Sequence, residues 1–237
     1  MTRRVILFDV DGTLISDRSQ EDDDRLSRRR FQNAICDVTG KEPRVTPWRF
    51  AGMVDPQICR MLLAELGLNE QTIEDFLPKV IERMESLYRP MKKTIILNVG
   101  VDKLLPILAQ SQTHVLGVVT GNVSTICKEK LRAAGIDTYF SEGFYGDGYP
   151  DRNHLVEDAL QACMSKYHLA DRSNTIIVGD TPIDVTAANA ANATSVAIAS
   201  GVYSETELHE AGAEFVFHDL EPSKELLEAF QFAPIKT

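Results

Sequence analysis

The sequence predicts an α/β fold in which a doubly wound parallel sheet is interrupted by one inserted all-helical domain. Short apolar runs alternate with segments of helical periodicity over most of the 237 residues. Three of these runs end in a small polar cluster, as strands do at the ligand-binding edge of such a sheet. The alternation stops in the insert, where only helical patterns occur. We therefore expect a core domain of residues 1–15 and 96–237 and a helical cap of residues 16–95.

The first strand carries the most informative motif. The apolar run of residues 5–8 has the length and bulk of a buried strand, and Asp9, Asp11, Gly12 and Thr13 follow it with a single Val between the two acids. Residues two apart on a strand share a face, and Gly12 lets the backbone turn away. Two close carboxylates repel each other unless a hard cation offsets their charge. The alternative is an ordinary turn, since Asp and Gly are common turn residues.

The insert reads as helices separated by turns. Apolar residues recur at helical spacing in three segments, residues 25–38, 56–66 and 70–88. The acidic run of residues 21–24 is expected at a helix amino terminus, where carboxylates interact favourably with the helix dipole. Long inserts between sheet strands often act as lids.

After the insert, strands and helices alternate again. The predicted strands are residues 114–119, 139–140, 174–178, 195–199 and 214–217. The predicted helices are residues 101–110, 124–133, 153–167, 182–193, 205–211 and 223–230. Helical crossovers between successive strands imply a parallel sheet with helices on both faces, which is a Rossmann-like core.

Two further polar clusters follow strands of this core. Residues 120–122 (Thr-Gly-Asn) come after the second long apolar strand, and residues 179–184 (Gly-Asp-Thr-Pro-Ile-Asp) come after the third. The carboxyl ends of parallel strands meet at one edge of a sheet, so a single site formed by all three clusters is the economical explanation. A helix cap followed by a turn is the alternative for residues 120–122, and it is compatible with a site.

Composition limits the partners. The chain is 43% hydrophobic and 25% charged, and its 25 basic and 35 acidic residues give a net charge of −10. This charge argues against nucleic acid or an anionic membrane as partner, and a phosphate ligand would need local positive charge or a metal. The four cysteines are widely spaced, which favours reduced, mostly buried thiols and a cytoplasmic location. We recognise no signal peptide and no run of about 20 apolar residues.

With these three motifs in this order, the chain resembles the haloacid dehalogenase superfamily over its whole length. It looks most like the phosphoglycolate phosphatase-like branch, which has a helical (C1-type) cap after the first motif. The resemblance implies a Mg²⁺-dependent phosphatase that hydrolyses a small-molecule phosphomonoester through an aspartyl phosphate. It also implies a small phosphorylated metabolite as the partner, and we expect a monomer or homodimer.

The family's catalytic roles fall on matching residues of this chain. Asp9 would be the nucleophile that attacks phosphorus. Asp11 would protonate the leaving alkoxide and then activate water. Thr120 would donate its hydroxyl to a phosphoryl oxygen, and the amides around Gly121 and Asn122 would add donors at a helix start. Gly12 and Thr13 of the first motif are also expected to bind the phosphate.

The resemblance also implies the metal ligands. Asp180 would bind Mg²⁺ together with Asp9 and the main-chain carbonyl of Asp11. Asp184, one turn further along, would lie in the outer shell of the ion. Mg²⁺ prefers few carboxylates together with water and substrate phosphate.

The third motif departs from the family pattern, which usually places a Lys there. In the corresponding stretch, residues 148–154, Arg152 is the only Lys or Arg between a predicted strand and a predicted helix. Arg would supply a permanent charge with a different geometry from that of an ammonium group. We expect Arg152 to replace the lysine; the alternatives are Lys128, Lys130 or Lys166.

The cap loop of residues 48–56 resembles the substrate-specificity loop of the family. Arg49 is a candidate contact for a substrate anion, although an exposed Arg is more often only solvated. Trp48 and Phe50 are more often part of a cap core than stacked on a ligand.

Other activities remain as alternatives. Asp11 disfavours dehalogenases and phosphonate hydrolases, which lack an acid at that position. A phosphomutase of the β-phosphoglucomutase type keeps this Asp and is the closest rival, but its fourth motif commonly pairs adjacent acids, and only Asp180 is present here. A different class is a non-hydrolytic phosphoacceptor or binding protein.

Overall fold

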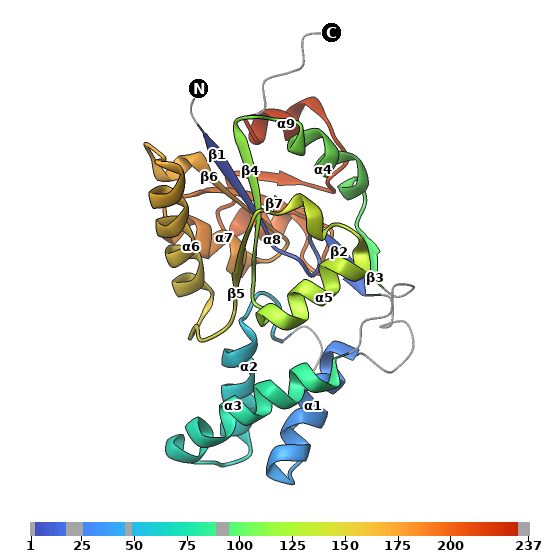
Figure 1. Cartoon of the computed structure of the whole chain (residues 1–237), viewed down its shortest axis with the longest axis vertical. Coiled ribbons are helices and arrows are strands. Elements are labelled where there is room, and N and C mark those ends of the chain that lie inside the picture. Colours follow the sequence, from blue (N-terminus) through green and yellow to red (C-terminus); the bar gives the residue numbers. More distant parts are fainter. Residues whose placement is uncertain (1–2, 18–25, 46–48, 89–94, 232–237) are drawn as a thin grey trace.

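The core strands form one six-stranded parallel sheet, as predicted (Figure 1). The computed structural model describes residues 3–17, 26–45, 49–88 and 95–231. The strands are β1 (Arg4–Phe8), β4 (His114–Thr120), β5 (Glu142–Tyr145), β6 (Thr175–Gly179), β7 (Thr194–Ile198) and β8 (Phe215–Phe217). Their spatial order is β5-β4-β1-β6-β7-β8, so the strand order reverses at the central strand β1. Open α/β sheets bind ligands at such a point.

Helices cover both faces of this sheet. They are α4 (Val101–Ala109), α5 (Ser124–Ala134), α6 (Arg152–Tyr167), α7 (Pro182–Ala190), α8 (Glu205–Glu210) and α9 (Lys224–Ala229). Ile6 and Phe8 of β1 face the apolar cluster that includes side chains of α4, α5 and α9. Val5 and Leu7 face the opposite cluster, which includes α6 and α7. All four side chains are fully buried, as expected for a strand covered on both faces.

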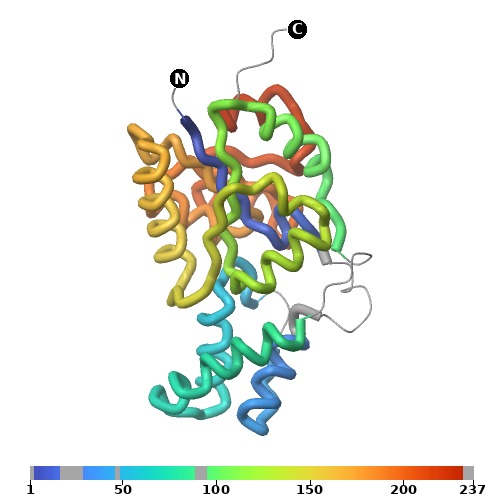
Figure 2. The backbone as a smooth tube through the Cα atoms, in the orientation of Figure 1, coloured from blue at the N-terminus to red at the C-terminus, as the bar shows by residue number. Residues whose placement is uncertain are grey.

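The insert consists of α1 (Leu26–Thr39), α2 (Asp55–Glu65) and α3 (Glu70–Leu87), each within one residue of its predicted bounds. These helices pack around an apolar cluster of their own, and Figure 2 shows them below the sheet. The chain enters and leaves the insert through β2 (Ile15–Asp17) and β3 (Ile95–Leu97), which pair antiparallel. These two strands were not predicted, because three residues are too few to show a period.

One predicted strand was wrong. Residues 139–140 are not in the sheet, since Asp137–Tyr139 form a 3-10 helix. The strand is instead β5, which pairs with residues 117–120 of β4. The side chains of Tyr139 and Phe140 are partly buried against the core of the sheet. In the sequence, such a pair of apolar residues looks like part of a strand.

The helix predicted over residues 182–193 ends at Ala190, and Asn192 adopts a left-handed conformation with φ 57°. The acidic run of residues 21–24 and Trp48 lie outside the described residues.

The cysteines agree with the expectation of reduced, mostly buried thiols. All four are free, and Cys59, Cys127 and Cys163 are buried, whereas Cys36 is exposed. Among the helices that the structure describes, none combines the length and the apolar character that crossing a bilayer requires.

Phe8 tests the assigned core. Its ring packs edge-on against Phe140 and Phe230, with ring centroids 6.3 and 6.2 Å away. We expect Phe8→Ala to lower the free energy of unfolding by about 3–5 kcal/mol, because apolar contacts are lost and a cavity remains. Urea denaturation measures this quantity. Val99→Ala, at a side chain that is 62% exposed, should change it by less than about 0.5 kcal/mol; equal effects of the two substitutions would contradict the assignment.

Candidate active site

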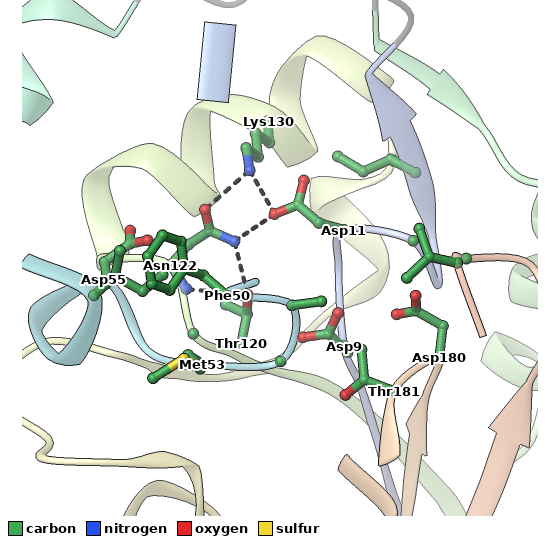
Figure 3. A pocket seen from close by; sticks show the side chains of 18 of the residues that line it. Asp9, Asp11, Phe50, Met53, Asp55, Thr120, Asn122, Lys130, Asp180 and Thr181 are labelled. Carbon is green, nitrogen blue, oxygen red and sulfur yellow. Dashed lines mark hydrogen bonds and ion pairs between the residues drawn. The ribbon is translucent and has the colours of Figure 1, made fainter. Parts of the chain in front are cut away.

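Three neighbouring strands bring the predicted site residues to one edge of the sheet. Asp9 directly follows β1, Asp180 directly follows β6, and Thr120 is the last residue of β4. Because β4 and β6 both pair with β1, these residues are close in space. They line one cavity of about 370 Å³, whose wall also includes Phe31 of the insert and Phe50, which is labelled in Figure 3.

Arg152 pairs with Asp9. The NH2 group of Arg152 donates to Asp9 Oδ1 at 2.9 Å, and Arg152 is only 2% exposed. Burial raises the pKa of Asp9 to about 8. The positive charge of Arg152 opposes this rise, and the carboxylates of Asp184 and Asp11 add to it. The protein alone therefore holds Asp9 in an environment that disfavours its ionised form.

Asp180 lies beside Asp9 and is fixed by close packing. The Thr13 hydroxyl donates to Asp180 Oδ1 at 3.2 Å. A Cβ atom on Gly12 would lie 2.3 Å from Asp180 Oδ2, and one on Gly201 would lie 1.8 Å from the same atom. A side chain at either position would therefore displace the Asp180 carboxylate, and Gly12 also has a positive φ of 88°, which favours glycine.

The carboxylates of Asp9, Asp180 and Asp184 form a cluster that fits a divalent cation. One carboxylate oxygen from each lies within 4.8 Å of the others, and all three residues are buried. Burial, and then repulsion from Asp9 and Asp184, raises the pKa of Asp180. The ionised cluster is therefore costly unless additional positive charge offsets it. Carboxylate oxygens are the ligands that Mg²⁺ prefers, so this donor set suits that ion.

Both oxygens of Asp184 have partners within the protein. Oδ2 accepts from the backbone N–H of Thr181 at 3.2 Å and from its hydroxyl at 2.7 Å, which completes a capping box at the start of α7. Oδ1 lies 2.7 Å from the NH2 group of Arg152, an ion pair without hydrogen-bond geometry. These contacts orient both oxygens of Asp184 within the cluster. Its place in the outer shell of a metal stays a prediction.

Asp11 belongs to a second charged cluster, although it is only two residues from Asp9. Lys130 forms an ion pair with Asp11 Oδ2, and Asn122 Nδ2 donates to the same oxygen at 2.6 Å (Figure 3). Desolvation raises the pKa of Asp11, but the charge and hydrogen bonds of Lys130 and Asn122 outweigh it and the pKa is lowered. The side chain still faces the cavity and is 43% exposed. The two carboxyls thus have opposite pKa shifts. A nucleophile has to be ionised and a general acid protonated, so a bound cation, which lowers the pKa of a neighbouring carboxyl, would be needed for Asp9 to act as a nucleophile.

Known proteins share this combination of sequence and fold. The sequence model of the haloacid dehalogenase-like hydrolases matches residues 6–198. The chain belongs to this family. The resemblance seen in the motifs is therefore confirmed, and the protein is an enzyme of a hydrolase family.

Relatives of this haloacid dehalogenase-like hydrolase carry several names. A phosphoglycolate phosphatase of Vibrio parahaemolyticus is 26% identical over 226 residues, which cover 95% of this chain and 95% of that protein. A solved structure from Haemophilus somnus, described as a phosphoglycolate phosphatase, is 22% identical with a TM-score of 0.66 and covers 93% of this chain and 96% of its own. One from Thermotoga maritima, described as a β-phosphoglucomutase, is 20% identical with a TM-score of 0.57 and covers 96% and 98%. The two structures support the fold alone.

The Thr120-Gly121-Asn122 turn of this hydrolase is in contact with the insert. Asn122 Nδ2 donates to Thr120 Oγ1 at 2.9 Å. The Gly121 carbonyl oxygen accepts from the backbone N–H of Asp55 at 2.7 Å. A Cβ atom on Gly121 would lie 2.1 Å from the carbonyl oxygen of Met53, so this approach of the insert requires glycine.

Two expected phosphate or substrate contacts lie outside the cavity lining. Thr13 is fully buried and donates to Asp180, whereas Gly12 does line the cavity. Arg49 pairs with Glu65, and its side chain is 42% exposed. The structure thus gives Thr13 a supporting contact and places Arg49 on the surface. A direct contact of either residue with a substrate stays a prediction.

The lysines considered as alternatives to Arg152 differ in position. Lys130 lines the cavity, but Lys128 and Lys166 do not. Lys166 pairs with Glu142 and is 58% exposed. Arg152 and Lys130 are therefore both at the site, each with a different carboxylate.

Sequence reasoning missed part of the charge in the cavity. Arg30 was given no role, Asp55 was named only as part of the cap loop of residues 48–56, and Lys130 was only an alternative. The three are 7%, 2% and 3% exposed. Arg30 NH2 donates to Asp55 Oδ1 at 2.8 Å. A signal for Lys130 was present: it lies on the apolar face of α5 between buried Ile126 and Leu131, where a charged side chain needs a partner.

Binding of Mg²⁺ can be measured without substrate. We expect Mg²⁺ at 100 times its Kd to stabilise the wild type by about 2.7 kcal/mol, seen as a rise in Tm. The rise should be lost in Asp180→Asn and kept in Asp102→Asn, which changes an exposed acid in the first turn of α4. Because the pKa of Asp9 is raised to about 8, Mg²⁺ must displace a proton at lower pH, so at one fixed Mg²⁺ concentration the rise in Tm should grow between about pH 6 and pH 8. A rise that survives Asp180→Asn would place the ion elsewhere.

Proposed function

We propose that this hydrolase is a Mg²⁺-dependent phosphatase that hydrolyses a small-molecule phosphomonoester through an aspartyl phosphate on Asp9. The observation that carries the proposal is the convergence of Asp9, Asp11, Thr120 and Asp180 on one cavity. The name of the Vibrio parahaemolyticus relative, a phosphoglycolate phosphatase, also supports it.

The first half of the reaction would be a displacement at phosphorus. Arg152 holds Asp9 Oδ1, which leaves Oδ2 to attack. A bond forms between this oxygen and phosphorus, the ester P–O bond breaks, and the leaving alkoxide takes a proton from Asp11. Thr120 would donate its hydroxyl to a phosphoryl oxygen.

The second half would be hydrolysis of the aspartyl phosphate. Asp11 accepts a proton from water, the water oxygen bonds to phosphorus, and the bond to Asp9 breaks to release phosphate and restore both carboxyl groups. The lowered pKa of Asp11 favours the ionised form that this step needs. The first displacement needs Asp11 protonated, and the negative charge of a bound phosphate would raise its pKa in that step. Because Lys130 pairs with the same carboxylate, Asp11 keeps a fixed orientation while it exchanges protons.

The proposed ion would be held by Asp9, Asp180 and the main-chain carbonyl of Asp11, with Asp184 in its outer shell. Mg²⁺ there supplies the positive charge that the acidic cluster and an incoming phosphate dianion both require. Arg152 contributes a permanent charge to the same cluster and takes the place of the usual lysine.

The insert would act as the cap of this enzyme. We assign residues 16–95 to a C1-type helical cap and residues 1–15 and 96–237 to the catalytic core. The cap residues Phe31 and Phe50 would contact the leaving group, since they line the cavity that holds Asp9. The substrate would be a small phosphorylated metabolite that fits in this cavity. We also propose that the enzyme is cytoplasmic and that neither nucleic acid nor a membrane is its partner.

The nucleophile is tested by Asp9→Asn. This change removes the ionisable oxygen with little change of shape, and we expect the release of phosphate from p-nitrophenyl phosphate with Mg²⁺ to fall by at least about 10³-fold. Asp102→Asn should leave the rate unchanged. A wild type that forms a stable phosphoprotein without turnover would favour a phosphoacceptor. Transfer of phosphate between sugar phosphates without net release would favour the mutase.

Arg152 is tested by a pair of substitutions. Arg152→Ala should lower kcat/KM by about 10²-fold or more, because two buried carboxylates lose their guanidinium. Arg152→Lys keeps the positive charge but loses the planar guanidinium that can contact two carboxylates at once. It should therefore retain more activity than Arg152→Ala. Lys166→Ala removes an exposed cation on the same helix and should have no effect. Normal turnover of Arg152→Ala would refute the assignment.

A further inference from the structure

The Asn122 amide uses all of its hydrogen-bonding capacity inside the protein. Nδ2 donates to Asp11 Oδ2 at 2.6 Å and to Thr120 Oγ1 at 2.9 Å. Oδ1 accepts from Lys130 Nζ at 2.9 Å and from Arg30 NH1 at 3.3 Å. The reverse orientation of the amide would turn its NH₂ group towards two cations and its oxygen towards a carboxylate. The surrounding charges therefore fix this amide in one orientation.

This orientation determines what the Thr120 hydroxyl can do. Thr120 Oγ1 accepts from Asn122 Nδ2 and, at 3.3 Å, from the Asn122 backbone N–H. A hydroxyl oxygen has two lone pairs and one hydrogen, so both acceptor sites are used and the hydrogen is left for donation. The proposed function requires the Thr120 hydroxyl to donate a hydrogen bond to a phosphoryl oxygen.

Arg30 reaches Asn122 from the insert. Arg30 lies on α1, and its NH2 group donates to Asp55 Oδ1 at 2.8 Å. Asp55 is itself attached to the turn on both sides of Asn122: its Oδ2 accepts from Val123 N at 3.0 Å, and its N–H donates to the Gly121 carbonyl at 2.7 Å. Two residues of the insert thus hold the turn that carries Asn122.

We propose that Arg30 is a positioning residue that acts through Asn122. Docking of the insert through Arg30 and Asp55 sets the orientation of the Asn122 amide, which in turn aims the Thr120 hydroxyl and holds the Asp11 carboxylate. The insert thus adds to the contacts that Lys130 and Asp11 of the core make with Asn122, and both sets of contacts are needed for the working arrangement of the catalytic groups. This inference rests on the proposed phosphatase function.

The kinetic signature of such a residue is a loss in kcat. Arg30→Met should lower kcat for p-nitrophenyl phosphate by about 10²-fold, because displaced catalytic groups slow the chemical step. KM should change by less than about threefold, since no substrate contact is removed. Arg83→Met is the matched control: it removes an ion pair between α3 and α1 of the same insert, Arg83 Nε to Asp37 Oδ2 at 2.7 Å, at a side chain 44% exposed. Its kcat and KM should equal those of the wild type.

A double-mutant cycle separates action through Asn122 from a direct contact with substrate. Asn122→Ala should reproduce the loss in kcat, and adding Arg30→Met to Asn122→Ala should cause no further loss. Acetyl phosphate, whose leaving group is small, should show the same loss in Arg30→Met as p-nitrophenyl phosphate. Additive losses in the cycle, or a loss confined to the larger ester, would mean that Arg30 contacts the leaving group and would overturn the proposal.

The outcomes also separate this inference from the function on which it rests. A wild type that releases no phosphate from any phosphomonoester overturns the proposed function and this inference together. An active wild type with normal kcat in Arg30→Met overturns the inference alone. If Arg30→Met does not fold, Arg30→Lys enters the same cycle; it keeps the charge but loses the fork, and an intermediate loss in kcat that vanishes in the Asn122→Ala background is the supporting result.

Discussion

The arrangement of the site depends on the balance of buried charges at the end of β1. Asp9 and Asp184 share the guanidinium of Arg152, and Asp180 lies within the same cluster. Three carboxylates and one guanidinium leave excess negative charge, which is why burial and mutual repulsion raise the pKa of both Asp9 and Asp180. Removing one partner of a buried ion pair leaves an uncompensated charge, so loss of Arg152 would lower the stability of the fold.

The second cluster is balanced pair by pair. Lys130 pairs with Asp11 and Arg30 pairs with Asp55, and Asn122 lies between the two pairs. Asp9 and Asp11 are two residues apart in the chain, yet they belong to clusters with different charge balance, and only the pKa of Asp11 is lowered. The left-handed backbone at Gly12 lets the chain turn between the strand end and the next segment. The two carboxyls can therefore take different roles without being far apart.

The sequence predicted those features that depend on local patterns. Alternating apolar runs predicted the parallel sheet, and polar clusters after three strands located the cavity, because topology brings strand ends together. Arg152 was singled out because it is the one cation between a predicted strand and a predicted helix, and it lines the cavity beside Asp9. The roles of Arg30 and Asp55 depend on how the insert packs against the core, and no local pattern shows that packing. The misplaced strand at residues 139–140 has a similar cause, since burial of a short apolar pair does not distinguish a strand from a 3-10 turn.

The cavity wall has two parts that differ in their contacts: one is held by hydrogen bonds between insert and core, and the other consists of apolar side chains of the insert. Backbone contacts of residues 53–55 with the turn at Gly121 leave little freedom there, because a side chain on Gly121 would overlap the insert. Phe31 and Ile58 line the same cavity and belong to the apolar cluster of the insert. A change in these apolar side chains alters the shape of the cavity without removing a hydrogen bond of Asn122. Substrate choice could thus diverge on this fold while the arrangement around Asp9 and Asp11 is kept, as expected where function resides in a site carried by a common fold.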